Sequence, residues 1–291
     1  MNLHTPINHR LAERLSREIE GEVMVDAASR GRYATDASFY QIEPLAVVVP
    51  KRADDVAATL AIAREEGVPV LPRGGGTSQS GQTVGRAVVI DTTKHLNRIV
   101  ETDFENRTAW VEPGIAMDDL NRQIKGSGLW FPVDVSTSSR ATIGGMTGNN
   151  SCGTRSIRYG IMRDNVLEID ALLADGGRAR FGMLDGDFAK HNLPDTVRDL
   201  FRDLRAIGGR EQAHIATAFP EVSRRVGGYL IDALAPSPDG TAAPFNAATL
   251  LCGSEGTLAI SERIKIKLSA QPKAKALGLC HFATFRAAME S

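Results

Sequence analysis

A strand, a helix and a second strand follow one another early in the chain, and this order restricts the fold of the N-terminal part. Residues 45–49 form a continuous apolar, β-branched run closed by Pro50, as expected of a buried strand. Residues 54–66 have acidic side chains in the first turn, one apolar face and a glycine at the end, which predicts a helix. Residues 68–71 and 87–91 give two further short strands. Buried strands joined by a helix are typical of a parallel βαβ unit.

The rest of the chain has a different pattern. A strand at 108–111 and a helix at 117–125 precede a long segment rich in glycine, serine, threonine and asparagine. Residues 169–181 have the pattern of a β-hairpin with a glycine-containing turn, and helical pieces are expected over 195–235. Residues 257–268 alternate apolar and polar side chains, which predicts an amphipathic strand. This part therefore favours an antiparallel sheet.

The predicted fold class is α+β (α/β), with two subdomains. A small parallel βαβ subdomain is expected over residues 33–100, after an N-terminal helical segment at 1–32. A larger subdomain with a mixed or antiparallel sheet and flanking helices is expected over 101–270. Residues 271–291 are expected to begin a further domain.

Charge and cysteine content exclude several classes of protein. The 34 Lys and Arg residues against 35 Asp and Glu leave a net charge of −1, so no basic excess points to nucleic acid. The three cysteines, Cys152, Cys252 and Cys280, form no C-x-x-C pair, so neither a zinc site nor a disulfide framework is predicted. The sequence has no signal-peptide pattern and no apolar run long enough for a membrane span. We therefore expect a cytoplasmic protein with reduced thiols.

The sharpest local feature is the segment Pro-Arg-Gly-Gly-Gly-Thr-Ser at residues 72–78, directly after a predicted strand. Three successive glycines let a ligand approach the main chain closely. Successive N–H groups in such a turn can form a concave anion site, to which the hydroxyls of Thr77 and Ser78 would add donors. Such a turn can also simply connect two strands. The segment is neither a Walker loop nor G-x-G-x-x-G, because Gln79 stands where the last glycine would be.

Two further glycine-rich segments occur far along the chain. Residues 142–153 combine four glycines with asparagine amides, which can donate and accept hydrogen bonds at the edge of a heterocycle such as a flavin. Residues 252–258 lead directly into the predicted amphipathic strand. Each segment alone could be an ordinary surface turn. Three glycine-rich segments at strand ends fit one extended dinucleotide better than three independent turns.

These segments, together with Gly81, Glu-Pro-Gly at 112–114 and Arg-Tyr-Gly at 158–160, resemble the FAD-binding domain of the vanillyl-alcohol oxidase / p-cresol methylhydroxylase superfamily. Within it, the chain is most similar to FAD-linked dehydrogenases of D-2-hydroxy acids such as glycolate, D-lactate and D-2-hydroxyglutarate. The sequence at 149–160 resembles that of large bacterial members with a following iron–sulfur region. The resemblance, over residues 33–268, implies FAD as cofactor and a small 2-hydroxy acid as substrate. It also implies an iron–sulfur region, a quinone or an electron-transfer protein as electron acceptor.

The resemblance implies a role for each matching segment. The loop of residues 72–78 would hold the FAD diphosphate. The segment around 142–151 would line the diphosphate and the isoalloxazine, and the segment at 255–260 would contact the adenosine end. The cofactor contacts implied in this way are Pro72, Arg73, Gly74, Gly75, Gly76, Thr77, Ser78, Asp134, Ala141, Thr142, Gly144, Gly145, Asn149, Asn150, Ser151, Cys152, Glu255, Gly256, Thr257, Leu258 and Ile260.

One departure from the family pattern bears on how FAD is held. Relatives with covalently bound flavin have a histidine at the position that matches Thr77, and threonine cannot form that bond. The resemblance therefore implies non-covalent FAD. A cysteinyl-flavin relative has its thiol several residues before Cys152, and Cys152 is expected to be buried and inert.

No catalytic base is assigned from the sequence. In the family, the base, the substrate clamp and any metal ligands come largely from a cap domain, whose first strand residues 277–282 would form, so the chain is expected to be a fragment. Arg155 and Arg158 could bring positive charge to a flavin or a substrate carboxylate, or form surface ion pairs. Tyr229 could approach the active site or pack in the core. No metal site is expected, and surface positions are expected for the histidines His4, His9, His95, His191, His214 and His281.

Three functional interpretations are weighed. The leading one is the FAD-binding half of an oxidoreductase that oxidises a D-2-hydroxy acid by hydride transfer to FAD. The second is a flavin-binding module without chemistry of its own. The third is a serine hydrolase, because residues 252–256 approach the pattern Gly-x-Ser-x-Gly around Ser254, with a cysteine at the first glycine. A strand rather than a helix is predicted after Ser254, which disfavours the hydrolase.

Overall fold

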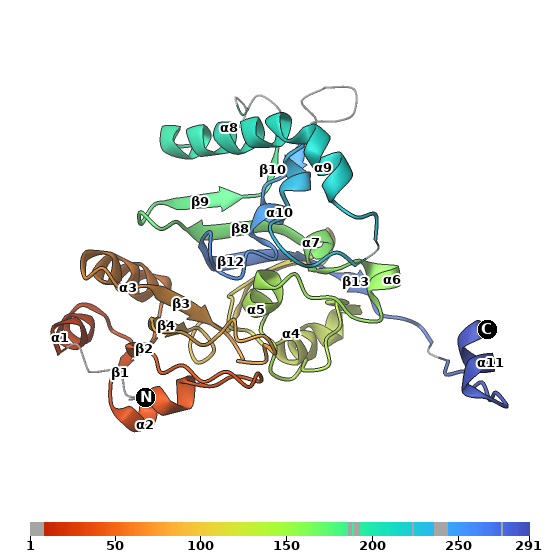
Figure 1. The fold of residues 1–291 in the computed structure, drawn as a ribbon, viewed down its shortest axis with the longest axis horizontal. Helices are drawn as coiled ribbons and strands as arrows, with labels where there is room; N and C mark the ends of the chain where they lie inside the picture. Colours follow the sequence, from red (N-terminus) through yellow and green to blue (C-terminus); the bar gives the residue numbers. More distant parts are fainter. Residues whose placement is uncertain (1–8, 186–187, 189–192, 223, 236–243, 275) are drawn as a thin grey trace.

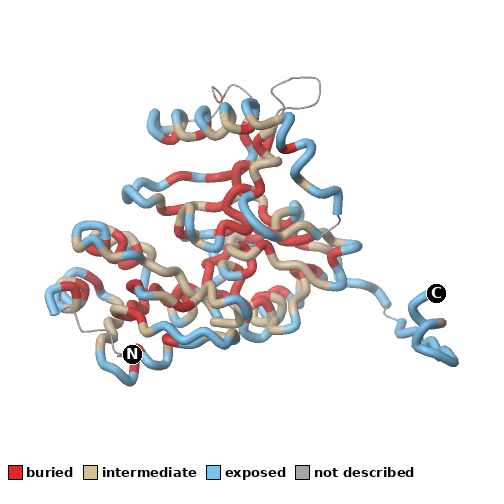
Figure 2. Tube along the Cα trace, viewed as in Figure 1, coloured by how far each residue is buried: buried red, intermediate tan, exposed pale blue. Residues whose placement is uncertain are grey.

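The computed structural model of the protein contains two main sheets, each with its own helices (Figure 1). Buried residues follow the two sheets and the helices that face them (Figure 2). None of the helices described is long and apolar enough to cross a membrane. The residues that the structure describes are 9–185, 188, 193–222, 224–235, 244–274 and 276–291.

The first sheet has the strand order β1-β2-β4-β3. Strands β2 (Ala46–Val49), β3 (Val70–Arg73) and β4 (Val88–Asp91) are parallel, and β1 (Glu22–Met24) pairs antiparallel with β2. Helix α3 (Ala53–Glu65) connects β2 to β3, which confirms the βαβ unit. The other helices of this part are α1 (His9–Glu18), which packs on α3, and α2 (Ala27–Tyr33), which contacts β2.

The second sheet has the order β5-β6-β12-β8-β9, and all of its neighbouring strands are antiparallel. The predicted hairpin is confirmed as β8 and β9, with Ile169 opposite Phe181. The predicted amphipathic strand is confirmed as β12, whose side chains at Ile264 and Ile266 are fully buried. The strands are β5 (Ile99–Asp103), β6 (Thr108–Val111), β8 (Val166–Leu172), β9 (Arg178–Phe181) and β12 (Ile260–Lys267).

Several helices and short elements pack around the second sheet and share its large apolar core, but the last helix, residues 285–290, has no buried residue and lies apart from the sheet (Figure 1). The helical pieces expected over 195–235 are confirmed as α8, α9 and a short 3-10 helix. The helices are α4 (Met117–Ile124), α5 (Ile143–Gly148), α6 (Ser156–Tyr159), α7 (Met162–Asn165), α8 (Asp195–Arg210), α9 (Gln212–Ala218), α10 (Ala248–Leu251) and α11 (Phe285–Glu290), with 3-10 helices at Lys125–Ser127 and Ile231–Leu234. The short strands are β7 (Leu129–Trp130), β10 (Met183–Leu184), β11 (Phe245–Asn246) and β13 (Ser269–Ala270).

Some elements differ from those predicted. Residues 143–148, expected as loop, form helix α5, because the Thr142 hydroxyl accepts a hydrogen bond from the Gly145 N–H at 3.1 Å and caps the helix. Residues 277–282, expected as a strand, are exposed, and no described strand pairs with them. The short elements β1, α2 and β5 were not predicted. The proposed subdomain boundaries stay a prediction.

Candidate FAD-binding site

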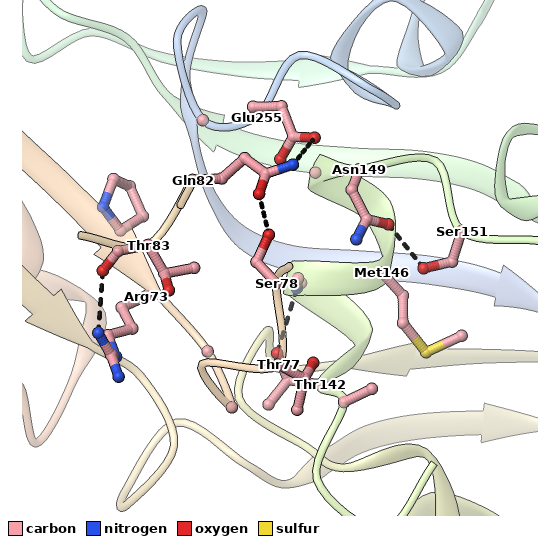
Figure 3. Close-up of a pocket in the computed structure, with 18 of the residues that line it drawn as sticks. Arg73, Thr77, Ser78, Gln82, Thr83, Thr142, Met146, Asn149, Ser151 and Glu255 are labelled. Carbon is pink, nitrogen blue, oxygen red and sulfur yellow. Dashed lines mark hydrogen bonds between the residues drawn. The ribbon is translucent and has the colours of Figure 1, made fainter. Parts of the chain in front are cut away.

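A cavity of about 430 Å³ is lined by residues from both halves of the chain. It is formed by the loop after β3, by α5 with the residues that follow it, and by the turn before β12 (Figure 3). The three glycine-rich segments of the sequence therefore meet around one space. The first of them follows the carboxyl end of a parallel strand, where sheets of this kind commonly bind ligands. The volume lies within the range of small-molecule sites, about 300–1,000 Å³.

The loop of residues 74–78 offers unpaired backbone donors to the cavity. The N–H groups of Gly75, Gly76, Thr77 and Ser78 have no hydrogen-bond acceptor within the described part of the chain. Gly76 has a φ of +65°, which glycine adopts without strain. Gly75 is exposed and Gly76, Thr77 and Ser78 are half-buried, so these donors are open to a ligand. A run of successive N–H groups around a cavity favours an anionic one.

Arg73, at the start of this loop, bonds backbone carbonyl groups of neighbouring segments. Its Nη1 donates to the carbonyl oxygen of Thr83 at 2.9 Å, and its Nη2 donates to that of Thr35 at 2.8 Å. Burial lowers the pKa of Arg73, while the charges of Asp91 and Asp36 oppose this shift. The guanidinium is therefore occupied by the protein itself, and it ties the start of the loop to the backbone of Thr35 and Thr83.

Helix α5 forms part of the cavity wall, but its first N–H groups are already hydrogen-bonded within the protein. The N–H of Gly144 donates to the carbonyl oxygen of Pro113 at 2.8 Å, and that of Gly145 donates to the Thr142 hydroxyl. A Cβ on Gly144 would lie 2.6 Å from the Cβ of Pro113, so the glycine permits this close packing. The donors at the start of α5 are thus already used within the protein.

A hydrogen-bonded bridge joins the first and third glycine-rich segments. Gln82 Oε1 accepts from the Ser78 hydroxyl, and Gln82 Nε2 donates to Glu255 Oε1 at 3.4 Å (Figure 3). The residues Gln82 and Glu255 are 173 positions apart in the sequence. Burial raises the pKa of Glu255, and the hydrogen bond from Gln82 opposes this rise. Glu255 has a φ of +52°, an uncommon conformation outside glycine, so the surrounding turn holds it in this position.

Asn149 and Ser151 lie at the end of α5 and face the cavity (Figure 3). The Ser151 hydroxyl donates to Asn149 Oδ1 at 2.6 Å, which orients the amide. The Asn149 amide nitrogen has no acceptor among the described residues, so it remains available as a donor to a ligand.

Comparison with known families agrees with this geometry. Residues 44–182 match the family described as "FAD binding domain". The chain contains an FAD-binding domain. The predicted resemblance to the FAD-binding domains of D-2-hydroxy-acid dehydrogenases is confirmed, and FAD is the cofactor of this domain.

Curated relatives of this FAD-binding domain are dehydrogenases or oxidases of 2-hydroxy acids by name. The chain is 35% identical over 274 residues to "D-2-hydroxyglutarate dehydrogenase" of Pseudomonas putida, covering 92% of this chain and 27% of that protein. It is 38% identical over 183 residues to "Glycolate oxidase subunit GlcD" of Bacillus subtilis, covering 60% of this chain and 38% of that protein. The chain therefore spans about a quarter of the length of the first relative.

A solved structure supports the fold. The crystal structure of alkyldihydroxyacetonephosphate synthase aligns with a TM-score of 0.63 and 18% sequence identity, covering 94% of this chain and 43% of that one. At this identity the likeness concerns the fold alone. The predicted class, a two-subdomain α+β fold with a parallel and an antiparallel part, is confirmed.

The cavity fits FAD in charge and in hydrogen-bonding chemistry. The four unpaired N–H groups of residues 75–78 suit a diphosphate, since each hydrogen bond to a charged group contributes about 1.5–3 kcal/mol. The titratable side chains among the described lining residues are Arg73, Cys152 and Glu255. Only one carboxylate, that of Glu255, therefore opposes an anion there.

Most residues that the sequence assigned to FAD line this cavity. Which of them contact the cofactor stays a prediction. Those that line it are Pro72, Arg73, Gly74, Gly75, Gly76, Thr77, Ser78, Ala141, Thr142, Gly144, Gly145, Asn149, Ser151, Cys152, Glu255, Gly256 and Ile260.

Four of the assigned residues lie outside the lining. The carboxylate of Asp134 accepts hydrogen bonds from the Thr154 hydroxyl and the Arg155 N–H. Asn150 is fully buried, and its side chain accepts a hydrogen bond from the Arg163 N–H. The Thr257 hydroxyl bonds the Tyr229 hydroxyl at 2.7 Å, and Leu258 packs on the apolar core.

The cysteines differ from expectation. Cys152 was expected to be buried, but it is only half-buried and lines the cavity, because the turn after α5 turns it toward that space. Cys252 is the fully buried thiol, and burial raises its pKa to about 12. All three cysteines are free.

The groups considered for chemistry do not gather in the cavity. Among the described histidines, none lines it, and the same holds for Arg155, Arg158 and Tyr229. The expected alternative of a surface ion pair is also not found for Arg155 or Arg158 within the described residues. Ser254 does line the cavity, but it is buried and its hydroxyl donates to the Leu251 carbonyl oxygen at 2.9 Å, which is not the environment of an exposed nucleophile.

The sequence reasoning missed several lining residues. Gln82, which carries the bridge, follows Gly81 of the family motif, and a polar side chain beside a glycine turn is the one signal that could have found it. The remaining ones carry no distinguishing pattern and enter the cavity through the fold: Gln79, Thr83, Thr92, Pro113, Val135, Ser136, Thr137, Met146, Gly148, Leu251, Ala259 and Ser261.

Proposed function

We propose that this chain is the FAD-binding part of an oxidoreductase that oxidises a D-2-hydroxy acid, such as D-lactate, glycolate or D-2-hydroxyglutarate, to the 2-oxo acid. The observation that carries the proposal is a cavity with unpaired N–H groups at residues 75–78, in a chain 35% identical to a D-2-hydroxyglutarate dehydrogenase. The name of the Bacillus subtilis relative supports the same substrate class. Because the chain spans about a quarter of the first relative, the activity of the whole protein is part of the proposal.

Different residues of the cavity hold different parts of the cofactor. The N–H groups of residues 75–78 bind the diphosphate, and Arg73 keeps their loop in shape. The Asn149 amide, oriented by Ser151, donates to the edge of the heterocycle. The contact from Gln82 to Glu255 closes the space between the first and third segments. Bound FAD supplies an acceptor for the hydride of the substrate.

Removal of the substrate hydroxyl proton requires a base within hydrogen-bond reach. Among the described lining residues Glu255 is the one carboxylate, and it is held by Gln82. We therefore propose that the base and the clamp for the substrate carboxylate come from a cap domain that residues 271–291 begin.

Three further features belong to the proposal. FAD is held without a covalent bond, because Thr77 cannot form a histidyl linkage. The electrons pass on to an iron–sulfur region, a quinone or an electron-transfer protein. The compartment is the cytoplasm, in keeping with three free cysteines.

The test begins with the purified chain and added FAD. We expect a flavin absorption spectrum after gel filtration, and we expect acid precipitation to leave the colour in the supernatant. Anaerobic addition of D-lactate, glycolate or D-2-hydroxyglutarate to the full-length protein that contains this chain should bleach the flavin, with L-lactate as control. Colour that stays with the precipitate would contradict non-covalent binding. A flavin that no D-2-hydroxy acid bleaches would favour the alternative, a binding module without chemistry of its own.

A further inference from the structure

Beside the cavity, the surface around α6 carries guanidinium groups stacked on aromatic rings. Arg155 lies over the ring of Trp130 at 4.8 Å, and Arg158 lies over the ring of Tyr159 at 5.4 Å. The two rings meet edge to face, with 5.7 Å between their centroids. The side chain of Ile157 between them is 88% exposed. We call Arg155, Ile157, Arg158 and Arg224 the arginine patch.

The charges of the arginine patch are not neutralised by the protein. No described ion pair includes Arg155, Arg158 or Arg224, although arginines elsewhere in the chain commonly pair with carboxylates. Arg224 Nη1 reaches the carbonyl oxygen of Gly153 at 3.4 Å, which brings it beside the same turn. Stacking covers the flat face of a guanidinium and leaves its N–H edge free for an outside acceptor.

The nearest carboxylates are engaged in other contacts. Asp134 accepts from the Thr154 hydroxyl at 2.9 Å and from the backbone N–H of Arg155 at 3.0 Å. Asp164 accepts from the N–H of Ile161 at 2.9 Å and faces Arg163. These contacts hold the turn in a fixed conformation, so that its arginines need little ordering when a partner binds.

The position of the arginine patch links it to the cofactor. Ser151 and Cys152 line the cavity, and Arg155, three residues after Cys152, is exposed. A partner on the patch therefore lies beside the end of the cavity that the resemblance assigns to the isoalloxazine. An exposed apolar side chain among arginines and aromatic rings is the composition of a protein interface rather than of a small-molecule pocket.

We propose that the arginine patch docks an electron-accepting protein with an acidic surface. The proposal rests on the proposed function, because it needs an enzyme that passes electrons on. With a one-electron iron acceptor the balance is FADH2 + 2 Fe³⁺ → FAD + 2 Fe²⁺ + 2 H⁺, and the protons go to solvent. Charges at the rim of an interface act mainly on the association rate and on its dependence on salt.

The test compares two ferric acceptors of opposite surface charge. The chain is loaded with FAD, reduced photochemically without oxygen, and mixed with cytochrome b5, which is acidic, or with cytochrome c, which is basic. For Arg155→Gln/Arg158→Gln we expect the second-order rate with cytochrome b5 to fall about tenfold at low salt, the lower end of electrostatic steering. The rate with cytochrome c should not fall. At about 0.5 M salt the difference should largely vanish, since surface charges are then screened.

Matched variants distinguish the effect of removing the arginine charges from a loss of structure or of FAD binding. Arg86 is exposed and has no described partner, so Arg86→Gln removes one charge elsewhere and should leave both rates unchanged. Arg155→Lys/Arg158→Lys keeps the charge and should keep most of the preference for cytochrome b5. The flavin spectrum and the FAD affinity of every variant should match those of the unmodified chain, because none of these residues lines the cavity.

Two outcomes would overturn the proposal: equal changes with both cytochromes, or no change with either. If the arginine patch binds phosphatidylglycerol vesicles and the reduction rates show no preference between the two cytochromes, the partner of the patch is a lipid surface instead of an acidic protein. Photochemical reduction involves no hydroxy acid. A failure of the substrate test under the proposed function therefore leaves this measurement intact, and the two failures are distinguishable.

Discussion

Gly75 offers the most direct test of the proposal that the N–H groups of residues 75–78 bind the FAD diphosphate. A Cβ added at Gly75 would lie 2.1 Å from the carbonyl oxygen of Arg140 and 2.9 Å from its carbonyl carbon. An ordinary carbon–oxygen contact is about 3.3 Å, so Gly75→Ala has to separate the loop from residue 140 by about 1.2 Å. A side chain at this position therefore meets the protein backbone.

The shift has a calculable effect on FAD binding. It moves the N–H groups of residues 75–78 relative to the rest of the cavity, and losing two hydrogen bonds to a charged group removes about 3–6 kcal/mol. The dissociation constant for FAD should therefore rise about 10²- to 10⁴-fold. Overpacking should also lower the free energy of unfolding by about 1–3 kcal/mol.

The assay is a titration of the apo chain with FAD, followed by flavin fluorescence, beside urea unfolding of the same sample. Gly209→Ala in α8 is the matched control, because a Cβ there meets nothing within 4 Å. It should leave FAD affinity unchanged and stabilise the fold by about 0.4–1 kcal/mol. A folded Gly75→Ala chain that binds FAD within threefold of the unmodified affinity would refute the assignment of these N–H groups to the diphosphate.

Three further outcomes are expected. Burial raises the pKa of Asp170, but hydrogen bonds from two arginines outweigh it and hold the pKa below its usual 3.8. The carboxylate thus stabilises the fold above about pH 4, and this contribution is lost as the pH falls through the lowered pKa; in Asp170→Asn the unfolding midpoint should depend less on pH between 4 and 2. In a Cys280→Ser background, Cys152 should react with a thiol reagent in the apo chain and be protected by FAD, while the buried Cys252 should react only after unfolding, as mass spectrometry would show. Phe201→Ala should lower the free energy of unfolding by about 3–5 kcal/mol in urea titrations, since this ring is fully buried in the large core.

The elements that the sequence predicted are those with a continuous or periodic apolar pattern. β2 and β4 are uniformly buried, and β12 alternates, so their side chains report their surroundings directly. β1 and β5 are short and largely half-buried or exposed, and no pattern marks them. Their pairing depends on neighbouring strands, a tertiary effect that the local sequence does not contain.

The candidate site was predictable as three segments but not as a set of contacts. The glycine pattern marked the segments around Gly75, Thr142 and Gly256, and the fold brings all three to one cavity. The bridge through Gln82 was not predictable, because its partner lies 173 positions away. The side chain of Asn150 looked equivalent to that of Asn149, yet its φ of +51° turns it into the protein, where it is fully buried.

The glycines of the site have two different structural roles, and the sequence alone does not distinguish them. At Gly144 and Gly114 the missing Cβ lets protein pack on protein, since a Cβ would lie 2.6 Å from the side chain of Pro113 and 2.0 Å from the carbonyl oxygen of Thr92. At Gly76 the positive φ turns the chain so that successive N–H groups remain without acceptors in the described structure. A glycine-rich segment therefore indicates a close approach to backbone, and the unpaired donors identify where a ligand, rather than the protein, makes that approach. This criterion favours the loop after β3 as the proposed diphosphate site, with α5 as a neighbouring wall of the cavity.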